Sequence, residues 1–151
     1  MDRLTNKNCP FCRMGRSEQD HVAVFEDGKI LVVMDLYPAT PGHVLVLPKQ
    51  HIKTLYEMPP DLGACLMTTA IKVAKVIKEK LSPDGLNLIQ SNETAAGQTV
   101  PHFHLHIVPR YQGDPVRLKF GHGNAPQTVR ELERIAFLLK SGLSPQRREN
   151  L

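Results

Sequence analysis

One short segment of the chain alternates histidines with apolar residues, and it reads Pro-His-Phe-His-Leu-His-Ile-Val-Pro over residues 101–109. In a β-strand, successive side chains point to opposite faces of the sheet, so residues two apart share a face. Neighbouring histidines would then have Cα atoms about 6.7 Å apart. The segment predicts a strand with three apolar residues in the core and three imidazoles on the opposite face: Phe103, Leu105 and Ile107 against His102, His104 and His106. Packing alone rarely requires such a row.

Two chemistries could use this row of imidazoles. Histidines two apart can converge on one zinc ion, and a catalytic zinc site with three histidine ligands keeps an open position for water. Alternatively, one neutral imidazole can act as a nucleophile towards phosphorus while its neighbours donate protons and hydrogen bonds to the phosphate. The spacing leaves both open. The preceding Gly97, Gln98 and Thr99 supply a permissive backbone, an amide and a hydroxyl, which suit phosphate oxygens better than a metal.

The rest of the chain predicts a mixed α/β composition around this strand. Glu26-Asp27-Gly28 predicts a tight turn between two strands. Apolar residues recur every three or four positions in two segments, which predicts two amphipathic helices. The segment 111–126 is rich in glycine and proline and predicts irregular structure, and 141–151 predicts a loose tail. The expected elements are strands at Val22–Phe25, Lys29–Met34, His43–Leu47 and Leu86–Gln90, and helices at Pro60–Leu81 and Val129–Leu139.

Composition excludes several classes of protein. A chain of 151 residues with 41% hydrophobic residues favours one globular domain. Its longest apolar runs are far shorter than the roughly 20 residues of a membrane helix, and its polar start lacks a signal-peptide core. A net charge of +4 suits a small anionic ligand, but with no Trp it does not predict nucleic-acid binding. Three cysteines, an odd number, do not suggest a disulfide framework, so we expect a cytoplasmic protein.

Two blocks of the sequence carry a resemblance to a known family. The first is Ala-Gly-Gln-Thr-Val-Pro-His-Phe-His-Leu-His-Ile-Val-Pro-Arg over residues 96–110. The second is Asp35-Leu-Tyr-Pro38 followed by Pro-Gly-His-Val-Leu-Val-Leu-Pro-Lys-Gln-His over 41–51. Both resemble the histidine-triad (HIT) superfamily of nucleotide hydrolases and transferases. The likeness covers about residues 9–112. It implies an α+β fold with an antiparallel sheet of about five strands and two helices, which we assign to a single domain over residues 1–140. It also implies a homodimer.

The resemblance implies a covalent mechanism in which the middle histidine, His104, attacks the α-phosphorus of a purine nucleotide. A nucleotidyl-histidine forms, and water then releases the nucleoside monophosphate, with no metal required for the step. By the same resemblance His106 contacts the phosphate and His102 orients His104. It also implies a set of substrate-binding residues, with Gln98, Thr99 and Asn92 at the phosphates, Asp35 at the ribose, Leu36 at the base and His43 close to the triad.

The two cysteines of Cys9-Pro-Phe-Cys12 have the spacing that lets two thiolates bind one zinc ion. A lone pair of this kind is a weak signal, and redox activity or free thiols are the alternatives. Several prokaryotic-type HIT proteins combine such a pair with two histidines, which would be His51 and His102 here. The resemblance therefore implies a structural Cys2His2 zinc site. Cys65 lies on the apolar side of a predicted helix and is interpreted as a core residue.

Four functions remain open after this comparison. The pattern around Gln98-Thr99 and Val108–Tyr111 is closer to the fragile-histidine-triad branch, which favours hydrolysis of a dinucleoside polyphosphate. An adenosine phosphoramidase that acts on AMP-lysine or AMP-amine substrates is the enzymatic alternative. A non-catalytic regulatory protein that binds a purine nucleotide and zinc is the third. A zinc-dependent hydrolase with all three triad histidines as ligands is the fourth.

Overall fold

The computed structural model describes residues 6–118 and 126–143. Residues 1–116 and 117–151 form two separate compact units, of which the first contains the sheet and the second contains α3. Within the described residues, no helix is both long and apolar enough to cross a membrane. The elements in chain order are α1 (Pro10–Gly15), β1 (Ala23–Glu26), β2 (Ile30–Met34), β3 (Val44–Pro48), the short 3-10 helix η1 (Leu55–Glu57), α2 (Pro60–Leu81), β4 (Gly85–Gln90), the 3-10 helix η2 (Thr94–Ala96), β5 (Leu105–Arg110) and α3 (Val129–Leu143).

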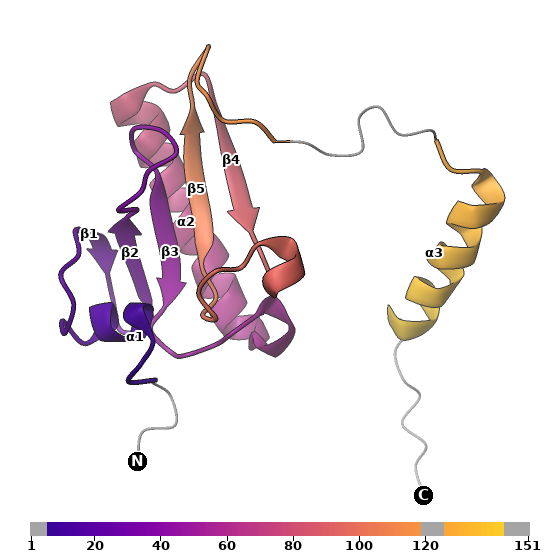
Figure 1. Cartoon of the computed structure of the whole chain (residues 1–151), viewed down its shortest axis with the longest axis horizontal. Helices are drawn as coiled ribbons and strands as arrows, with labels where there is room; N and C mark the ends of the chain where they lie inside the picture. Colours follow the sequence, from indigo (N-terminus) through magenta and orange to yellow (C-terminus); the bar gives the residue numbers. More distant parts are fainter. Residues whose placement is uncertain (1–5, 119–125, 144–151) are drawn as a thin grey trace, which may run out of the picture. The chain divides into compact units, whose positions relative to one another are not determined.

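The five strands form one antiparallel sheet in the order β1-β2-β3-β5-β4, with α2 along one face (Figure 1). The β1–β2 connection is tight because the Asp27 carboxylate accepts hydrogen bonds from the backbone N–H groups of Lys29 and Ile30, both at 2.7 Å. These two bonds lower the pKa of Asp27. The predicted hairpin is therefore confirmed, with β1 shifted by one residue and β2 beginning one residue later than predicted.

Alternation along the strands divides the apolar residues between two cores. The larger core lies between the sheet and α2, and the smaller one lies on the opposite face, where α1 packs. Phe103, Leu105 and Ile107 all lie in the larger core, as the alternation predicts. The side chains of β5 that face α2 therefore pack in the larger core, and the imidazoles lie on the opposite face of the sheet, which carries α1. The smaller core consists of Met14, Leu31, Val33, Leu45 and Leu47, with the half-buried Phe11 packed against it.

The helix α2 begins and ends where the apolar periodicity predicts. Pro60 occupies the first helical turn, where its missing N–H costs no hydrogen bond. The chain leaves the helix through Ser82, whose φ of 47° is left-handed. Lys78 donates a hydrogen bond from Nζ to the carbonyl of Pro83 at 2.7 Å, just beyond this end.

Two local predictions need correction, and one helix was not predicted. The strand β5 begins at Leu105, so His102 and His104 precede it, because the backbone N–H of Phe103 donates to the carbonyl of Ile52 and not to a strand neighbour. The short helix α1 was not predicted, since its six residues are too few to show a period. The helix α3 extends to Leu143, four residues past the predicted end. The predicted tail 141–151 lies outside the described residues from 144 onwards, and 119–125 of the irregular segment also lie outside them.

Candidate functional site

Two of the three triad histidines lie together on the sheet face that carries α1. The rings of His104 and His106 have centroids 5.0 Å apart, and the planes are 70° apart. His106 pairs across the sheet with Leu45 of β3 and Ile89 of β4. The ring of His43, which immediately precedes β3, lies with its centroid 5.1 Å from that of His106.

A neighbouring carbonyl decides which nitrogen of the buried His104 ring carries the proton when the ring is neutral. Its Nδ1 lies 2.7 Å from the backbone oxygen of His102. A carbonyl oxygen only accepts, so Nδ1 carries the proton and donates. A neutral imidazole holds one ring proton, which leaves a lone pair on Nε2 of His104. That nitrogen is the one a phosphorus centre could bond.

His106 and His43 are held in their neutral forms by burial. Desolvation, together with repulsion by His104 and His43, lowers the pKa of His106 to about 4, and the attraction of Asp35 offsets only part of this shift. Desolvation also lowers the pKa of His43, again against the opposing attraction of Asp35. Asp35 turns one carboxylate oxygen, Oδ2, towards both rings, at 3.4 Å from His43 Nε2 and 3.8 Å from His106 Nδ1. Its other oxygen accepts a hydrogen bond from the N–H of Tyr37 at 2.8 Å.

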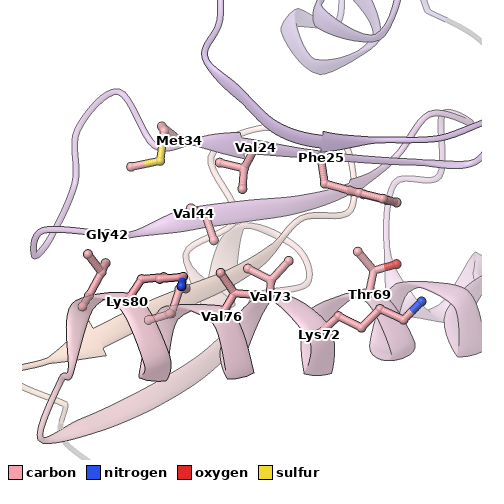
Figure 2. Close-up of a pocket in the computed structure, with 12 residues that line it drawn as sticks. Val24, Phe25, Met34, Gly42, Val44, Thr69, Lys72, Val73, Val76 and Lys80 are labelled. Carbon is pink, nitrogen blue, oxygen red and sulfur yellow. The ribbon is translucent and has the colours of Figure 1, made fainter.

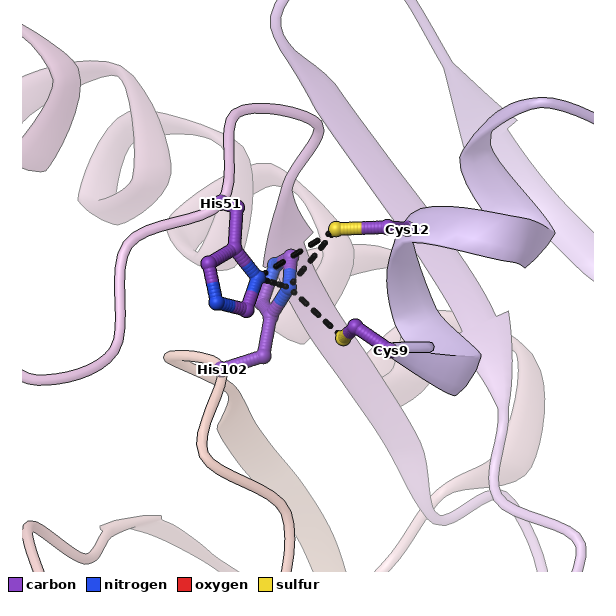
Figure 3. A group of neighbouring side chains, drawn as sticks. All are labelled: Cys9, Cys12, His51 and His102. Atoms are coloured by element: carbon purple, nitrogen blue, oxygen red, sulfur yellow. Dashed lines mark hydrogen bonds between the residues drawn. The ribbon is translucent and has the colours of Figure 1, made fainter. Parts of the chain in front are cut away.

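The first triad histidine, His102, turns towards a second cluster that also contains Cys9, Cys12 and His51 (Figure 3). Nδ1 of His102 lies 3.4 Å from Cys9 Sγ, 3.6 Å from Cys12 Sγ and 3.3 Å from His51 Nδ1. Cys12 Sγ lies 3.3 Å from His51 Nδ1. The cysteines come from the start of α1, whereas the two histidines follow β3 and precede β5.

The dimensions of this cluster fit a tetrahedral zinc ion. Bond lengths of about 2.0 Å for Zn–N and 2.3 Å for Zn–S at tetrahedral angles give N–N edges of about 3.3 Å and N–S edges of about 3.5 Å. The one N–N and three N–S distances, from 3.3 to 3.6 Å, agree with those edges. The donor set of two thiols and two imidazoles is also the one that structural zinc sites use.

Hydrogen bonds around the cluster leave the correct nitrogen of His102 free for a metal. Nε2 of His102 lies 2.8 Å from the carbonyl oxygen of Pro48, so it carries the proton and donates, and Nδ1 keeps its lone pair. Burial lowers the pKa of His102 to about 4, which keeps the ring neutral. Burial also raises the pKa of the Cys12 thiol, and a bound dication would offset this by stabilising the thiolate. The four residues fit the metal in number and geometry, and His102 fits it in tautomer as well.

The predicted phosphate-binding residues Asn92 and Gln98 are engaged in bonds that shape the loops. Gln98 accepts from the N–H of Glu93 at 2.8 Å and donates to the carbonyl of Lys53 at 2.7 Å. Asn92 accepts from the N–H of Leu55 at 2.7 Å and exchanges side-chain hydrogen bonds with Gln90. Both side-chain amides therefore connect the loop that contains η2 to the segment that precedes α2.

The predicted binding residues Thr99 and Leu36 lie on the surface. Thr99 is exposed and, with Gln98, lines a cavity of about 480 Å³ between the segment 53–57 and the loop that contains η2. Leu36 is 62% exposed, so it is available to a ligand and is not needed by the core.

Phe11 is a site residue that the sequence interpretation did not include. Its ring centroid lies 5.2 Å from that of His104 and 5.7 Å from that of His102. The signal was available, because Phe11 lies between Cys9 and Cys12 and any metal shared with His102 would bring it to the histidine row.

A separate apolar cavity of about 540 Å³ lies on the other face of the sheet, between its β1 side and α2 (Figure 2). Its walls include Val24 and Phe25 from β1 and Val73 and Val76 from α2, with Lys72 near its edge. It contains none of the histidines discussed above.

Comparison with known proteins agrees with this geometry. The HIT domain family profile matches residues 16–113. The chain is 36% identical over 107 residues to adenylylsulfatase HINT3 of Arabidopsis thaliana. The aligned region covers 71% of this chain and 54% of that protein. Among solved structures, a HIT family protein from Bacillus anthracis matches with a TM-score of 0.85 and 33% identity, over 92% of this chain and 99% of the other. A Zn-bound histidine triad family protein from Mycobacterium smegmatis matches with a TM-score of 0.69 and 32% identity, over 89% and 97%. With the histidine row, the sheet and the profile in agreement, the chain belongs to the HIT domain family.

Proposed function

We propose that the protein is a nucleotide-binding hydrolase that forms a covalent nucleotidyl intermediate on His104. The observation that carries this proposal is the hydrogen bond from His104 Nδ1 to the carbonyl of His102, because it directs the lone pair of Nε2 away from the backbone. Burial beside His106 and Phe11 also shields the ring from bulk water. A neutral imidazole is nucleophilic at pH 7 and can depart again from phosphorus.

The reaction proceeds in two displacements. In the first, Nε2 of His104 bonds to the α-phosphorus and the bond from phosphorus to the leaving group breaks, with the leaving group taking the electron pair and, if it is an amine, a proton from the solvent. In the second, water attacks phosphorus and gives a proton to the solvent, the electron pair of the P–N bond returns to Nε2, and the nucleoside monophosphate leaves. His106, the other ring of the row, contacts the phosphate oxygens. No resident metal takes part in either step.

The aromatic ring beside His104 supports a nucleoside as the substrate. Met14 and Leu45 are buried in the smaller core, whereas Phe11 is only half-buried and lies against the histidine row. We propose that the purine base packs on the accessible part of Phe11 and on Leu36, while Asp35 accepts hydrogen bonds from the ribose. Thr99 and its loop then face the phosphates.

Two classes of leaving group are supported by different observations. The sequence around Gln98-Thr99 favours a dinucleoside polyphosphate, from which a nucleoside phosphate leaves. The relative named adenylylsulfatase supports a mixed anhydride of AMP as the substrate. The AMP-amine substrates of a phosphoramidase are the third class that the experiment below includes. All three share an adenylyl group and differ only in what leaves from phosphorus.

We further propose that Cys9, Cys12, His51 and His102 hold a structural zinc ion. The tautomer of His102 and the edge lengths of the cluster support it, as does the Zn-bound relative. Bound zinc supplies a crosslink between α1 and the two loops that carry the histidines. His102 then has two roles, since its side chain faces the metal cluster while its carbonyl accepts the proton of His104.

We propose a homodimer that forms through β4 and α2. β4 is an edge strand with an open ladder, and Leu88 on it is 44% exposed. Met67 and Ile71 on α2 are also about half exposed, although they are large and apolar. Edge pairing between two copies would satisfy the open backbone groups and cover these side chains. Sedimentation equilibrium would measure the mass of the particle in solution, which should be twice the mass of one chain.

The experiment that tests the function is capture of the covalent intermediate. The protein is mixed with adenylate-labelled diadenosine polyphosphate, adenosine phosphoramidate or adenylyl sulfate, quenched with denaturant, and assayed for an acid-labile protein adduct. We expect an adduct with at least one substrate and none with His104→Ala at equal zinc content. Nucleotide binding without adduct or turnover would instead support the binding protein. Loss of turnover on chelation, with the fold intact and no His104 adduct formed, would support the zinc-dependent hydrolase.

A further inference from the structure

The second cluster of possible metal ligands on the chain consists of Asp35, His43 and His106. His43 Nε2 and His106 Nδ1 lie 2.9 Å apart, and Asp35 Oδ2 faces both. Two imidazoles and a carboxylate at such distances could hold a divalent metal or could share protons. The two possibilities require opposite protonation of His43, so the hydrogen bonds around that ring can decide between them.

The backbone of the preceding loop decides the protonation of His43. The N–H of Ala39 points at His43 Nδ1 over 3.0 Å. A backbone N–H can only donate, so Nδ1 must present a lone pair. The single proton of the neutral ring is therefore on Nε2. This assignment is stable to pH changes, because an amide does not titrate and desolvation already lowers the pKa of His43.

That tautomer excludes the metal interpretation of this cluster. A metal at Nε2 of His43 would need a lone pair there, which would force the proton onto Nδ1 and against the N–H of Ala39. His102 shows the reverse arrangement, since its Nε2 donates to the carbonyl of Pro48 and its Nδ1 is free for a metal. The two clusters have similar dimensions, and the direction of one hydrogen bond in each distinguishes them.

The proton on His43 Nε2 fixes the next ring in turn. It points towards Nδ1 of His106 at 2.9 Å, which must then accept. The Asp35 carboxylate at 3.4 Å from His43 Nε2 favours an N–H there over a lone pair. Within the described residues, the charged groups that act on His106 are His43, Asp35 and His104, and of these only His43 presents a donor within hydrogen-bond distance of Nδ1. The ring proton of His106 is therefore on Nε2.

We propose that His43 is a positioning residue that confines His106 to its Nε2–H tautomer, so that His106 donates a hydrogen bond to the substrate phosphate as a neutral ring. The chain of donors runs from the N–H of Ala39 through His43 to His106. That the Nε2 proton of His106 is donated to a substrate phosphate rests on the function proposed above, whereas the two tautomers do not depend on it. Because burial lowers the pKa of His106 to about 4, the ring could not supply a proton at neutral pH by becoming cationic. A neutral donor of fixed direction is what remains available.

The test reads the tautomers directly by long-range 1H–15N correlation spectra of the zinc-loaded protein labelled with 15N-histidine. We expect protonated-type Nε2 and unprotonated-type Nδ1 shifts for both His43 and His106 from pH 6 to pH 8. His43→Leu removes the donor, so the His106 shifts should move towards a mixture of the two tautomers. His43→Gln keeps an N–H donor in reach of His106 and should preserve its tautomer. His51 and His102 shifts with unchanged zinc content verify the fold of each variant.

Kinetics of the His104 adduct complete the test. His43→Leu should slow adduct formation by about 10- to 100-fold with little change in nucleotide affinity, and His43→Gln should recover much of the rate. A proton on Nδ1 of His106 in the unmodified protein, or unchanged His106 shifts in His43→Leu, would overturn the proposal. An unchanged adduct rate in His43→Leu would do the same. Failure of the unmodified protein to form any adduct would reject the proposed function, and the spectra alone would then decide the tautomers.

Discussion

Removal of one ligand from the Cys2His2 cluster should lower stability by an amount that can be estimated. Cys12 is buried at the start of α1 and lies next to His51 and His102, which are 39 and 90 residues away along the chain. Donors so far apart do not gather in an unfolded chain, where only Cys9 and Cys12 stay close, so zinc binds the folded state far more tightly. At a free zinc concentration 1,000 times the Kd, that preference is worth about 4 kcal/mol. For a chain of this length it corresponds to about 8–16 °C in Tm.

Cys12→Ala should abolish most of this stabilisation. If four ligands share the roughly 10–16 kcal/mol of a structural zinc site, one ligand accounts for about 2.5–4 kcal/mol, or a 10²- to 10³-fold weaker Kd. At the same zinc concentration the variant retains about 0.4–1.4 kcal/mol of the 4. Cys65→Ala is the matched control, because Cys65 lies on α2 outside the cluster and packs only partly against the larger core.

Thermal unfolding with and without a chelator, together with metal content by mass spectrometry, measures both quantities. The unmodified protein and Cys65→Ala should each hold one zinc and lose about the same Tm on chelation. Cys12→Ala should unfold near the chelated midpoint whether zinc is present or not. Equal chelator sensitivity in Cys12→Ala and Cys65→Ala would refute the assignment of the cluster as a folding crosslink.

Three further predictions concern the nucleotide surface, pH and backbone strain. Phe11→Ala should raise KM by about 3- to 10-fold with little change in kcat and with zinc retained, because an aromatic contact is worth about 0.5–1.5 kcal/mol; an unchanged KM would separate Phe11 from the substrate. His106 has a pKa of about 4 when folded and about 6.5 when unfolded, so between these values the unfolded chain binds the extra proton. The free energy of unfolding should therefore fall as pH drops from 6.5 to 4, by up to about 1.4 kcal/mol per unit from this group, and urea unfolding should show a shallower fall for His106→Asn. Gly42→Ala should lower the free energy of unfolding by about 2–4 kcal/mol, because its φ of +86° is strained for alanine and the added Cβ would collide with Leu81. Gly97→Ala is the control with a similar φ of +85° but open space around it, and it should lower the free energy of unfolding by about 1–2 kcal/mol. Equal losses of stability in thermal unfolding would contradict the collision.

The sequence predicted those parts of the fold that depend on local period. Apolar residues at helical spacing gave both ends of α2, and strict alternation placed Phe103, Leu105 and Ile107 in the core. Asp27-Gly28 gave the first hairpin. These features depend on residues within a few positions of one another, so the chain alone contains the information. The short helix α1 and the start of β5 depend on packing and on a hydrogen bond to Ile52, and local pattern missed both.

For the site, the sequence identified residue types and approximate neighbours. The cluster of Cys9, Cys12, His51 and His102 was expected, and the tertiary structure brings the four together at zinc-like distances. It also brings Phe11 to the histidine row, and it engages Gln98 and Asn92 in bonds between loops, which the sequence did not indicate. Their roles towards phosphate remain predictions.

The amino-acid sequence by itself determined which imidazoles the protein has and which face of the chain they occupy. Only the tertiary structure decided which nitrogen of each ring carries the proton. That choice depends on single donors and acceptors from other segments: the carbonyl of Pro48 for His102, and the ring of His43 for His106. An imidazole has two nearly equivalent nitrogens, and one hydrogen bond is enough to distinguish a metal ligand from a proton donor.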